Sequence, residues 1–293
     1  MKRVVLVGLG LIGGSIGLAL RKNLVGLEIV GVDKAAVVHS DFGRQLLSDA
    51  VTIEALTDTS QLAREADLVV LAMPVGAIAQ CVTDWLQACV PVTDCGSTKQ
   101  FIVNAAQSSP NRDWFLPGHP MAGRERGGQS SCSFNLFRGR RWIVCPEFAR
   151  EQALRATRTV VEAVGAIWTE MTPTEHDSAV ALTSHVPQIL ASWLAAAADE
   201  RFWSAAGPAF SDMTRIAGGP STIWKDIFAT NAGAISEVLG SMARYLSAIA
   251  AELGAEKPRL ELLLELLVNA RAQLESPKMR LDEPQLPEGD RTE

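Results

Sequence analysis

The chain has 293 residues, of which 33 are acidic and 27 are lysine or arginine. This length is enough for about two domains with a substantial core. The mildly acidic balance, without a lysine- or arginine-rich run, argues against nucleic acid and anionic membranes as partners. Five cysteines without Cys-x-x-Cys spacing favour reduced thiols over a disulfide framework or a metal site. Without a signal-peptide pattern or an uninterrupted apolar run of membrane-spanning length, we expect a cytoplasmic protein.

A dinucleotide-binding pattern opens the sequence. Residues 4–8 (VVLVG) form a β-branched run that is typical of a strand buried on both faces. Gly8, Gly10 and Gly13 follow in the spacing Gly-x-Gly-x-x-Gly, and a helix-forming stretch continues to about residue 24. Such glycines allow a tight turn and the close approach of a pyrophosphate, which the helix N-terminus then binds. Leu11 and Ile12, between the glycines, are therefore also candidates for cofactor contact.

An acidic residue completes this pattern. The apolar strand expected at 28–32 ends in Asp33, twenty residues after Gly13. A carboxylate there accepts hydrogen bonds from the adenosine ribose, and its charge repels a 2′-phosphate. The sequence therefore favours NAD over NADP. A glycine-rich turn without a ligand is the alternative, but strand, glycines, helix, strand and acid in this order favour dinucleotide binding.

The alternation of strands and helices continues to residue 171. We expect strands at 67–73, 90–93, 141–145 and 166–171, and helices at 76–89 and 151–164. This order predicts a Rossmann-like, doubly wound α/β domain over 1–171 whose strands continue one parallel or mostly parallel sheet. Ligands of such sheets bind beyond the carboxyl ends of the strands. Met73, Pro74 and Ser97 follow strands at that edge, and we expect them beside the cofactor.

The segment 94–127 carries most of the chemistry. It contains a hydroxyl at Ser97, an ammonium at Lys99, an imidazole at His119 and the acid–base cluster 124–126. The glycines and prolines around these groups predict exposed turns, which is where catalytic groups concentrate. Lys99 is expected either to neutralise phosphate or substrate charge or to be solvated.

The second half of the chain is predicted to be helical. Thr172 and Glu175 form a capping-box pattern that opens a helix over 173–199, kinked at Pro187. Further helices are expected at 221–253 and 259–275, after a glycine-punctuated segment at 207–219. The leucine-rich last helix predicts an all-α dimerisation domain over 172–280. The polar tail 281–293 is expected to be disordered.

Five motifs together resemble one enzyme family. VGLGLIGGS, DCGSTK, GHPMAGRE, HDSAVALTSHVP and DMTRIAGGPSTIW resemble the prephenate/arogenate dehydrogenase family of tyrosine biosynthesis, in the family's order and up to about residue 280. The resemblance implies an NAD-dependent enzyme that converts prephenate to 4-hydroxyphenylpyruvate with loss of CO2, and the apolar C-terminal helices predict that it is a homodimer. Arogenate, converted to tyrosine, is the alternative substrate. The chain looks like the stand-alone form of the enzyme, without a mutase or regulatory domain.

The resemblance also implies roles for individual residues. His119 takes the proton of the substrate hydroxyl, and Ser97 orients its imidazole through a hydrogen bond. Arg215 binds a substrate carboxylate, and Glu125 gates the pocket through an ion pair with that arginine. Trp224 matches an aromatic residue near the pocket, although packing in the core explains it equally well.

Other residues of the helical half have two interpretations. His185 either lines the substrate pocket or is a core histidine bonded to a backbone carbonyl. Gln188, one helical turn further, fits either substrate. His176, beside Asp177, is a weaker candidate that is expected to bond only near the start of its helix.

A non-catalytic, NAD-sensing dimer is the third interpretation of the whole chain. Sensing alone does not require Ser97, His119 and Arg215 together. Their joint presence therefore favours an enzyme.

Overall fold

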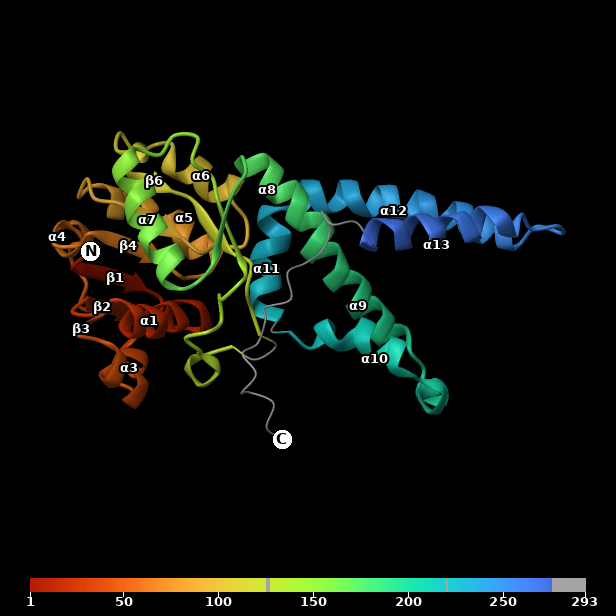
Figure 1. Ribbon diagram of the computed structural model, residues 1–293, viewed down its shortest axis with the longest axis horizontal. Coiled ribbons are helices and arrows are strands. Elements are labelled where there is room, and N and C mark those ends of the chain that lie inside the picture. The colour runs from red at the N-terminus through yellow and green to blue at the C-terminus, as the bar shows by residue number, and fades with distance from the viewer. Residues whose placement is uncertain (125–126, 220, 276–293) are drawn as a thin grey trace.

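The computed structural model describes residues 1–124, 127–219 and 221–275, so the predicted gate Glu125 and the tail 281–293 lie outside the described residues. A sheet-containing half is followed by a helical half (Figure 1). The helical half extends away from the sheets in two arms, and each arm is a pair of helices (Figure 1).

The first half is built on a six-stranded sheet in which every neighbouring pair is parallel. The strand order is β3-β2-β1-β4-β5-β6, which confirms the predicted doubly wound sheet. The direction of winding reverses between β1 and β4, where such sheets bind their ligands. The strands are β1 (Arg3–Val7), β2 (Glu28–Asp33), β3 (Asp49–Thr52), β4 (Leu68–Leu71), β5 (Val92–Asp94) and β6 (Phe115–Leu116).

Helices cover both faces of this sheet. Val4 and Leu6 of β1 lie in one core cluster, and Val5 and Val7 lie in the other, because successive side chains of a strand point to opposite faces. The first cluster includes residues of α1 (Leu11–Asn23), α2 (Ala35–Val38), α3 (Asp41–Leu46) and α7 (Glu151–Ala163). The second includes residues of α4 (Thr59–Arg64), α5 (Val75–Leu86) and α6 (Gln100–Ala106).

The last strands of this half form a separate sheet. β7 (Gly118–Pro120) pairs antiparallel with β8 (Arg141–Val144), and β8 pairs parallel with β9 (Ile167–Glu170). The prediction that 141–145 and 166–171 continue the main sheet is therefore wrong. β6 has two residues before Pro117, which has no N–H to donate to a ladder, so the chain leaves the main sheet there and pairs with β8 instead.

The segment 94–127 is more ordered than its glycines and prolines suggest. It contains α6, a 3₁₀ turn (Arg112–Trp114), β6 and β7. Lys99 is fully buried. The expectation of exposed turns is therefore wrong for this part of the segment.

The first long helix of the second half has three parts. The predicted capping box is present, because Thr172 and Glu175 exchange hydrogen bonds at the start of α8 (Pro173–Val180). A π-helical turn (Ala181–His185) then leads into α9 (Val186–Ala197). Pro187, the expected kink, lies two residues beyond the end of that turn, and a π turn is one way to absorb the missing proline N–H.

The whole stretch Pro173–Ala197 is long and apolar enough to cross a membrane by length and composition. One third of its apolar window is buried inside the protein. This stretch carries three buried polar residues, His176, Asp177 and His185. Part of it therefore packs in the interior of the protein.

The remaining helices differ from the predictions in one place. The helix expected at 221–253 is interrupted at Asn231, while the glycine-punctuated segment 207–219 contains a helix and a 3₁₀ turn. The buried Asn231 side chain donates to the Asp177 carbonyl oxygen, so the break anchors the helices to α8. The elements are a 3₁₀ turn (Glu200–Ala205), α10 (Pro208–Thr214), a 3₁₀ turn (Arg215–Gly218), α11 (Ser221–Thr230), α12 (Ala232–Leu253) and α13 (Leu260–Glu275).

Candidate active site

A cleft with about 310 Å³ of space for solvent lies at the carboxyl ends of β1, β4 and β5. α11 of the helical half contributes Ile223, Asp226 and Ile227 to its wall. The cleft therefore lies where the two halves meet. Among the predicted cofactor and catalytic residues, it is lined by Gly10, Leu11, Ile12, Met73, Pro74, Ser97 and His119.

The glycine turn at one end of the cleft has the shape that a dinucleotide requires. Gly8 has a φ of +92°, and a Cβ there would lie 2.4 Å from the Ala72 carbonyl oxygen. A Cβ on Gly13 would lie 1.9 Å from the Gly8 carbonyl oxygen, so both positions need glycine. A Cβ on Gly10 would meet no atom within 4 Å, which leaves open space at the start of α1. This open helix N-terminus fits a pyrophosphate.

Asp33 lies at the end of β2, beside this turn. Its Oδ2 accepts a hydrogen bond from the Leu9 N–H (2.7 Å), and its Oδ1 accepts one from the Lys34 N–H (2.7 Å). The backbone thus fixes the carboxylate at the position where a dinucleotide presents its ribose hydroxyls. These residues together fit NAD.

A segment that the sequence did not single out covers the start of α1. The Cys132 thiol donates to the Gly10 carbonyl oxygen (3.4 Å), and the Ser133 N–H donates to Ser15 Oγ (3.0 Å). Arg124, close before this segment, lines the cleft. The loop between β7 and β8 therefore borders the cleft. Its first residues belong to the GHPMAGRE motif, whereas no motif marks the part around Cys132 and Ser133.

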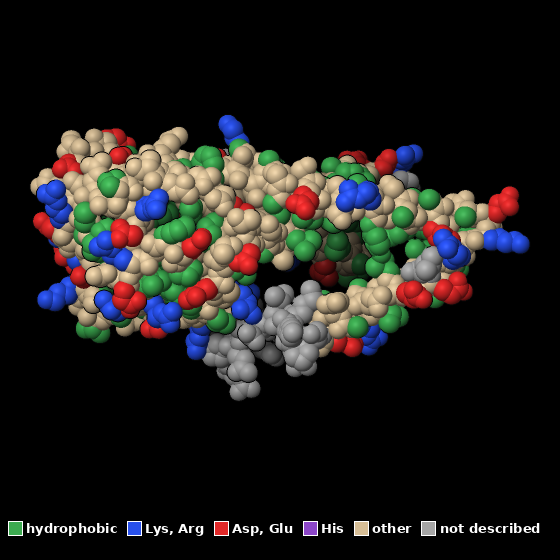
Figure 2. Space-filling view, turned by 90° about the horizontal axis from the view of Figure 1, so that it is seen from above, with side chains coloured by type: hydrophobic (Ala, Val, Ile, Leu, Met, Phe, Trp, Pro, Cys, Tyr) green, Lys and Arg blue, Asp and Glu red, His purple; other side chains and the backbone are tan. Residues whose placement is uncertain are grey.

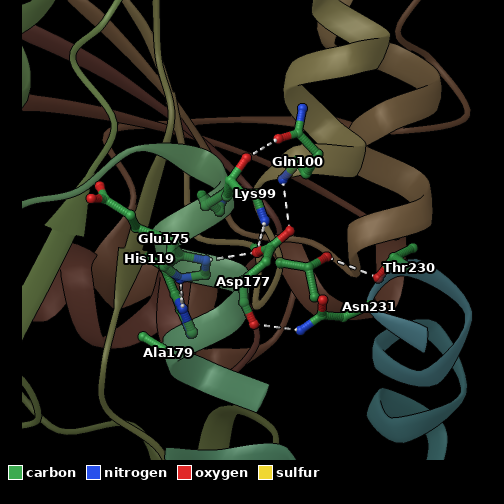
Figure 3. Close-up of polar contacts among 12 residues, drawn as sticks. Lys99, Gln100, His119, Glu175, Asp177, Ala179, Thr230 and Asn231 are labelled. Atoms are coloured by element: carbon green, nitrogen blue, oxygen red, sulfur yellow. Dashed lines mark hydrogen bonds and ion pairs between the residues drawn. The ribbon is translucent and has the colours of Figure 1, made fainter. Parts of the chain in front are cut away.

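His119 is the first of a chain of hydrogen-bonded side chains (Figure 3). Its Nδ1 lies 2.8 Å from His176 Nε2, and His176 Nδ1 lies 2.8 Å from Asp177 Oδ1. In the part of the chain that the structure describes, Ser97 lines the same cleft without a hydrogen bond to the imidazole. His176 lies at Nδ1 instead, so the role of Ser97 in orienting the ring stays a prediction. The other ring nitrogen, Nε2, is left for a ligand.

Asp177 and His176 form the inner part of this chain and belong to α8. His176 is fully buried, and Asp177 is 5% exposed. Asp177 also accepts hydrogen bonds from the backbone N–H groups of Lys99 (2.7 Å) and Gln100 (2.9 Å), as Figure 3 shows. The sequence analysis ranked His176 as a weaker candidate. The only signal for its role was the adjacent His-Asp pair just after the capping box.

A buried ion pair supports His119 from the other side. Lys99 Nζ donates to the carboxylate of Asp94 and to the Gly118 carbonyl oxygen (2.6 Å), and Asp94 Oδ1 accepts from the Gly118 N–H (3.0 Å). Both expectations for Lys99, solvation and charge neutralisation in the cleft, are therefore wrong. The pair instead ties Gly118, the residue before His119, to the end of β5.

This environment keeps His119 uncharged. Burial, together with the nearby Lys99 ammonium and the imidazoles of His176 and His185, which disfavour a further positive charge, lowers the pKa of His119 well below its ordinary value of 6.5. Burial also lowers the pKa of His176, although its hydrogen bond to Asp177 opposes this shift. At neutral pH, His119 is a neutral imidazole that can accept a proton.

Asp177 behaves in the opposite way. Burial raises its pKa, but the hydrogen bonds from His176, Lys99 and Gln100 outweigh burial and lower the pKa below the ordinary 3.8. Asp177 is therefore a carboxylate at neutral pH.

Among the predicted substrate residues that the structure describes, His185, Gln188, Trp224 and Arg215 do not line the cleft. His185 is 1% exposed, and its Nδ1 lies 3.2 Å from the Asn231 side-chain nitrogen. Its ring packs edge-on against Trp224 at 6.0 Å. Gln188 is 8% exposed and donates to Ser192 Oγ (3.3 Å).

This geometry favours the core interpretations of His185 and Trp224, although the partner of His185 is a side-chain amide rather than a backbone carbonyl. Arg215 is exposed in its 3₁₀ turn and lies outside the lining of the cleft. His119 and Ser97 are thus brought together with the cofactor turn, whereas His185, Gln188, Trp224 and Arg215 are not.

The fold and the cleft together define a class: a two-domain dehydrogenase with a nucleotide-binding α/β domain and a helical domain. Residues 16–170 match the nucleotide-binding domain of prephenate dehydrogenase, and residues 172–268 match the prephenate dehydrogenase dimerization domain. The chain belongs to the prephenate dehydrogenase family. The family and the two-domain fold expected from the sequence motifs are therefore confirmed.

Individual relatives carry related names. The prephenate dehydrogenase of Bacillus subtilis (strain 168) is 33% identical over 243 residues, which are 78% of this chain and 64% of that enzyme. The cyclohexadienyl dehydrogenase of Zymomonas mobilis is 30% identical over 81% of this chain and 84% of its own length. The crystal structure of Synechocystis arogenate dehydrogenase is similar with a TM-score of 0.76 and 26% identity, covering 93% of this chain and 99% of that one.

Proposed function

We propose that this protein is an NAD-dependent dehydrogenase that oxidises and decarboxylates prephenate to 4-hydroxyphenylpyruvate in tyrosine biosynthesis. The observation that carries the proposal is His119, a neutral imidazole whose Nε2 is left for a ligand in the cleft beside the glycine turn. Arogenate is the second candidate substrate. The similarity to Synechocystis arogenate dehydrogenase and to a relative named cyclohexadienyl dehydrogenase supports it.

The residues of the cleft match what this reaction needs. Prephenate carries a hydroxyl on the ring carbon that loses hydride, and loss of CO2 then makes the ring aromatic. NAD, when bound, supplies the hydride acceptor. His119 accepts a hydrogen bond from the substrate hydroxyl through Nε2 and then takes its proton. Ser97 lines the same cleft, which supports a role for its hydroxyl beside the substrate hydroxyl.

Binding of the two substrate carboxylates requires cations. Arg124 lines the cleft and is one candidate. Arg215 keeps its predicted role as a carboxylate-binding residue, and Glu125 its predicted role as a gate. His185, Gln188 and Trp224, which do not line the cleft, shape the helical half beside it rather than touching the reacting atoms.

We further propose that the chain acts as a cytoplasmic homodimer that contacts neither nucleic acid nor membrane. Its dimerization domain and the exposed apolar side chains of α12 and α13 support assembly through the C-terminal helices. Residues 1–171 and 172–280 are taken as the two domains.

The test is the formation of NADH by purified protein with prephenate and with arogenate, each offered with NAD and with NADP. Turnover of prephenate with NAD supports the proposal. A preference for arogenate would make arogenate the substrate in the proposal and would leave the role of His119 as the base unchanged. Binding of NAD without turnover of either substrate overturns the proposal and favours the sensor.

A further inference from the structure

We propose that Asp177 and His176 are positioning residues that hold the proton of His119 on Nδ1, so that its Nε2 lone pair faces the cleft. The inference deepens the proposed function, because it rests on His119 as the base. In this proposal, α8 of the helical half orients His119 so that it can accept the substrate proton.

The first step is the fixed acceptor at the end of the chain. The Asp177 carboxylate takes three hydrogen bonds, two from the backbone N–H groups of Lys99 and Gln100 and one from His176. A carboxylate can only accept hydrogen bonds. His176 must therefore carry a proton on Nδ1.

The second step follows from the neutrality of both rings. A neutral imidazole with a proton on Nδ1 has a lone pair on Nε2. His176 Nε2 lies 2.8 Å from His119 Nδ1, so that hydrogen bond requires the proton to be on His119 Nδ1. A doubly protonated His176 would reverse the arrangement, but its burial beside the Lys99 ammonium disfavours a second charge. Neutral His119 is left with its lone pair on Nε2.

The third step is that this bond crosses the boundary between the halves. His119 belongs to β7, whereas His176 and Asp177 belong to α8. Two further side-chain contacts hold the helices in place, from Thr98 to Thr230 (2.8 Å) and from Asn231 to the Asp177 carbonyl oxygen (2.8 Å), as Figure 3 shows. The orientation of the base thus depends on the docking of α8 against the nucleotide-binding half.

The direct test is nitrogen NMR of protein labelled with ¹⁵N-histidine. The chain has four histidines, so each ring can be assigned by single substitutions. We expect His119 to show a protonated Nδ1 and a bare Nε2. In His176→Asn, which retains a polar group near the Nδ1 position but does not reach His119, we expect a mixture of the two forms. His39→Asn changes an exposed histidine outside the network and should leave the His119 signals unchanged. A wild-type His119 protonated on Nε2 would overturn the inference.

Kinetics provide the second test. We expect His176→Asn and Asp177→Asn to lower kcat about 10- to 100-fold with little change in substrate KM or in NAD affinity. His176→Gln, whose amide oxygen can replace the Nε2 acceptor, should recover part of that loss. A raised KM with unchanged kcat would contradict a positioning role. If the wild-type protein turns over neither substrate, the proposed function fails, while the NMR result still decides the tautomer.

Discussion

The two halves of this protein bury their apolar side chains in different ways. The nucleotide-binding half has two core clusters, one on each face of its sheet. The helical half has a small cluster centred on Ala181, Val186, Ile227 and Ile235. Large apolar side chains instead reach its surface, among them Trp193 (66% exposed) and others along α12 and α13. Apolar side chains lie between charges of both signs on the face in Figure 2.

This difference fits the proposed assembly. The sheet half buries apolar side chains on both faces of its sheet, whereas the helical half leaves exposed apolar side chains that a second copy of the chain would cover in the proposed dimer. The candidate active site lies at the boundary between the two halves. The sheet half supplies the cofactor turn and His119, and α8 supplies the pair His176–Asp177 that orients it.

The largest effect is expected from breaking the buried ion pair of the sheet half. Lys99→Met leaves the Asp94 carboxylate buried without its cation. We expect the free energy of unfolding to fall by about 3–5 kcal/mol, measured by urea denaturation. Lys34→Met, at an exposed lysine of the same half, is the control and should change it by less than about 0.5 kcal/mol. A similar small loss in both variants would show that the pair does not anchor this half.

The exposed face of the helical half should respond in its assembly rather than in its fold. Leu264 and Leu267 of α13 are 59% and 64% exposed. Burial in a dimer contributes about 1.5–3 kcal/mol for each leucine. Leu264→Glu combined with Leu267→Glu should therefore give a monomer in sedimentation with unchanged helical content. Val25→Glu, at a fully exposed position of the sheet half, should stay dimeric. A dimer that survives the double change would exclude this face.

Acid should weaken the helical half. Burial lowers the pKa of His185 to about 4; the charge of Asp177 opposes this shift and that of His176 adds to it. Below its unfolded value of about 6.5, the unfolded chain binds more protons than the folded one, so stability falls as the pH drops from there to about 4. The loss from this group amounts to at most about 3 kcal/mol. Unfolding curves measured across this range should be flatter with pH in His185→Gln. Equal slopes in both proteins would exclude His185 as the source.

The fold of the first half could largely be predicted from the sequence because its signals are local. The glycine spacing, the β-branched run before it and Asp33 after the second strand all act within about one βαβ unit. The pairing of the strand at 141–145 was not predicted, because the sequence pattern of a strand does not indicate with which other strand it pairs. That choice depended on the chain leaving β6 at Pro117.

The candidate site could be predicted only in part, for a similar reason. His119 and Ser97 lie in recognisable motifs after strands of the sheet. His176 was underrated because its partner is 57 residues away in sequence. Lys99 appeared solvent-exposed because only the folded chain brings Asp94 and Gly118 around its ammonium.

The smallest expected effect comes from a substitution that should weaken NAD binding without changing the stability of the fold. Gly10→Ala adds a Cβ into open space at the start of α1, so the fold should be unchanged while NAD binds about tenfold more weakly, or about 1.4 kcal/mol. Calorimetric titration with NAD measures this change. Gly233→Ala adds a Cβ into equally open space in the helical half and should leave NAD affinity unchanged. Unchanged affinity in Gly10→Ala would show that the cofactor does not approach this turn.

The most direct test of the account is the turnover of His119→Asn beside its affinity for NAD. The account predicts that kcat with the better of the two substrates falls about 100-fold or more, since a general base contributes about that much. The affinity for NAD should stay within about twofold of the wild-type value. Turnover within a few-fold of the wild type would contradict His119 as the base, and with it the purpose assigned to His176 and Asp177.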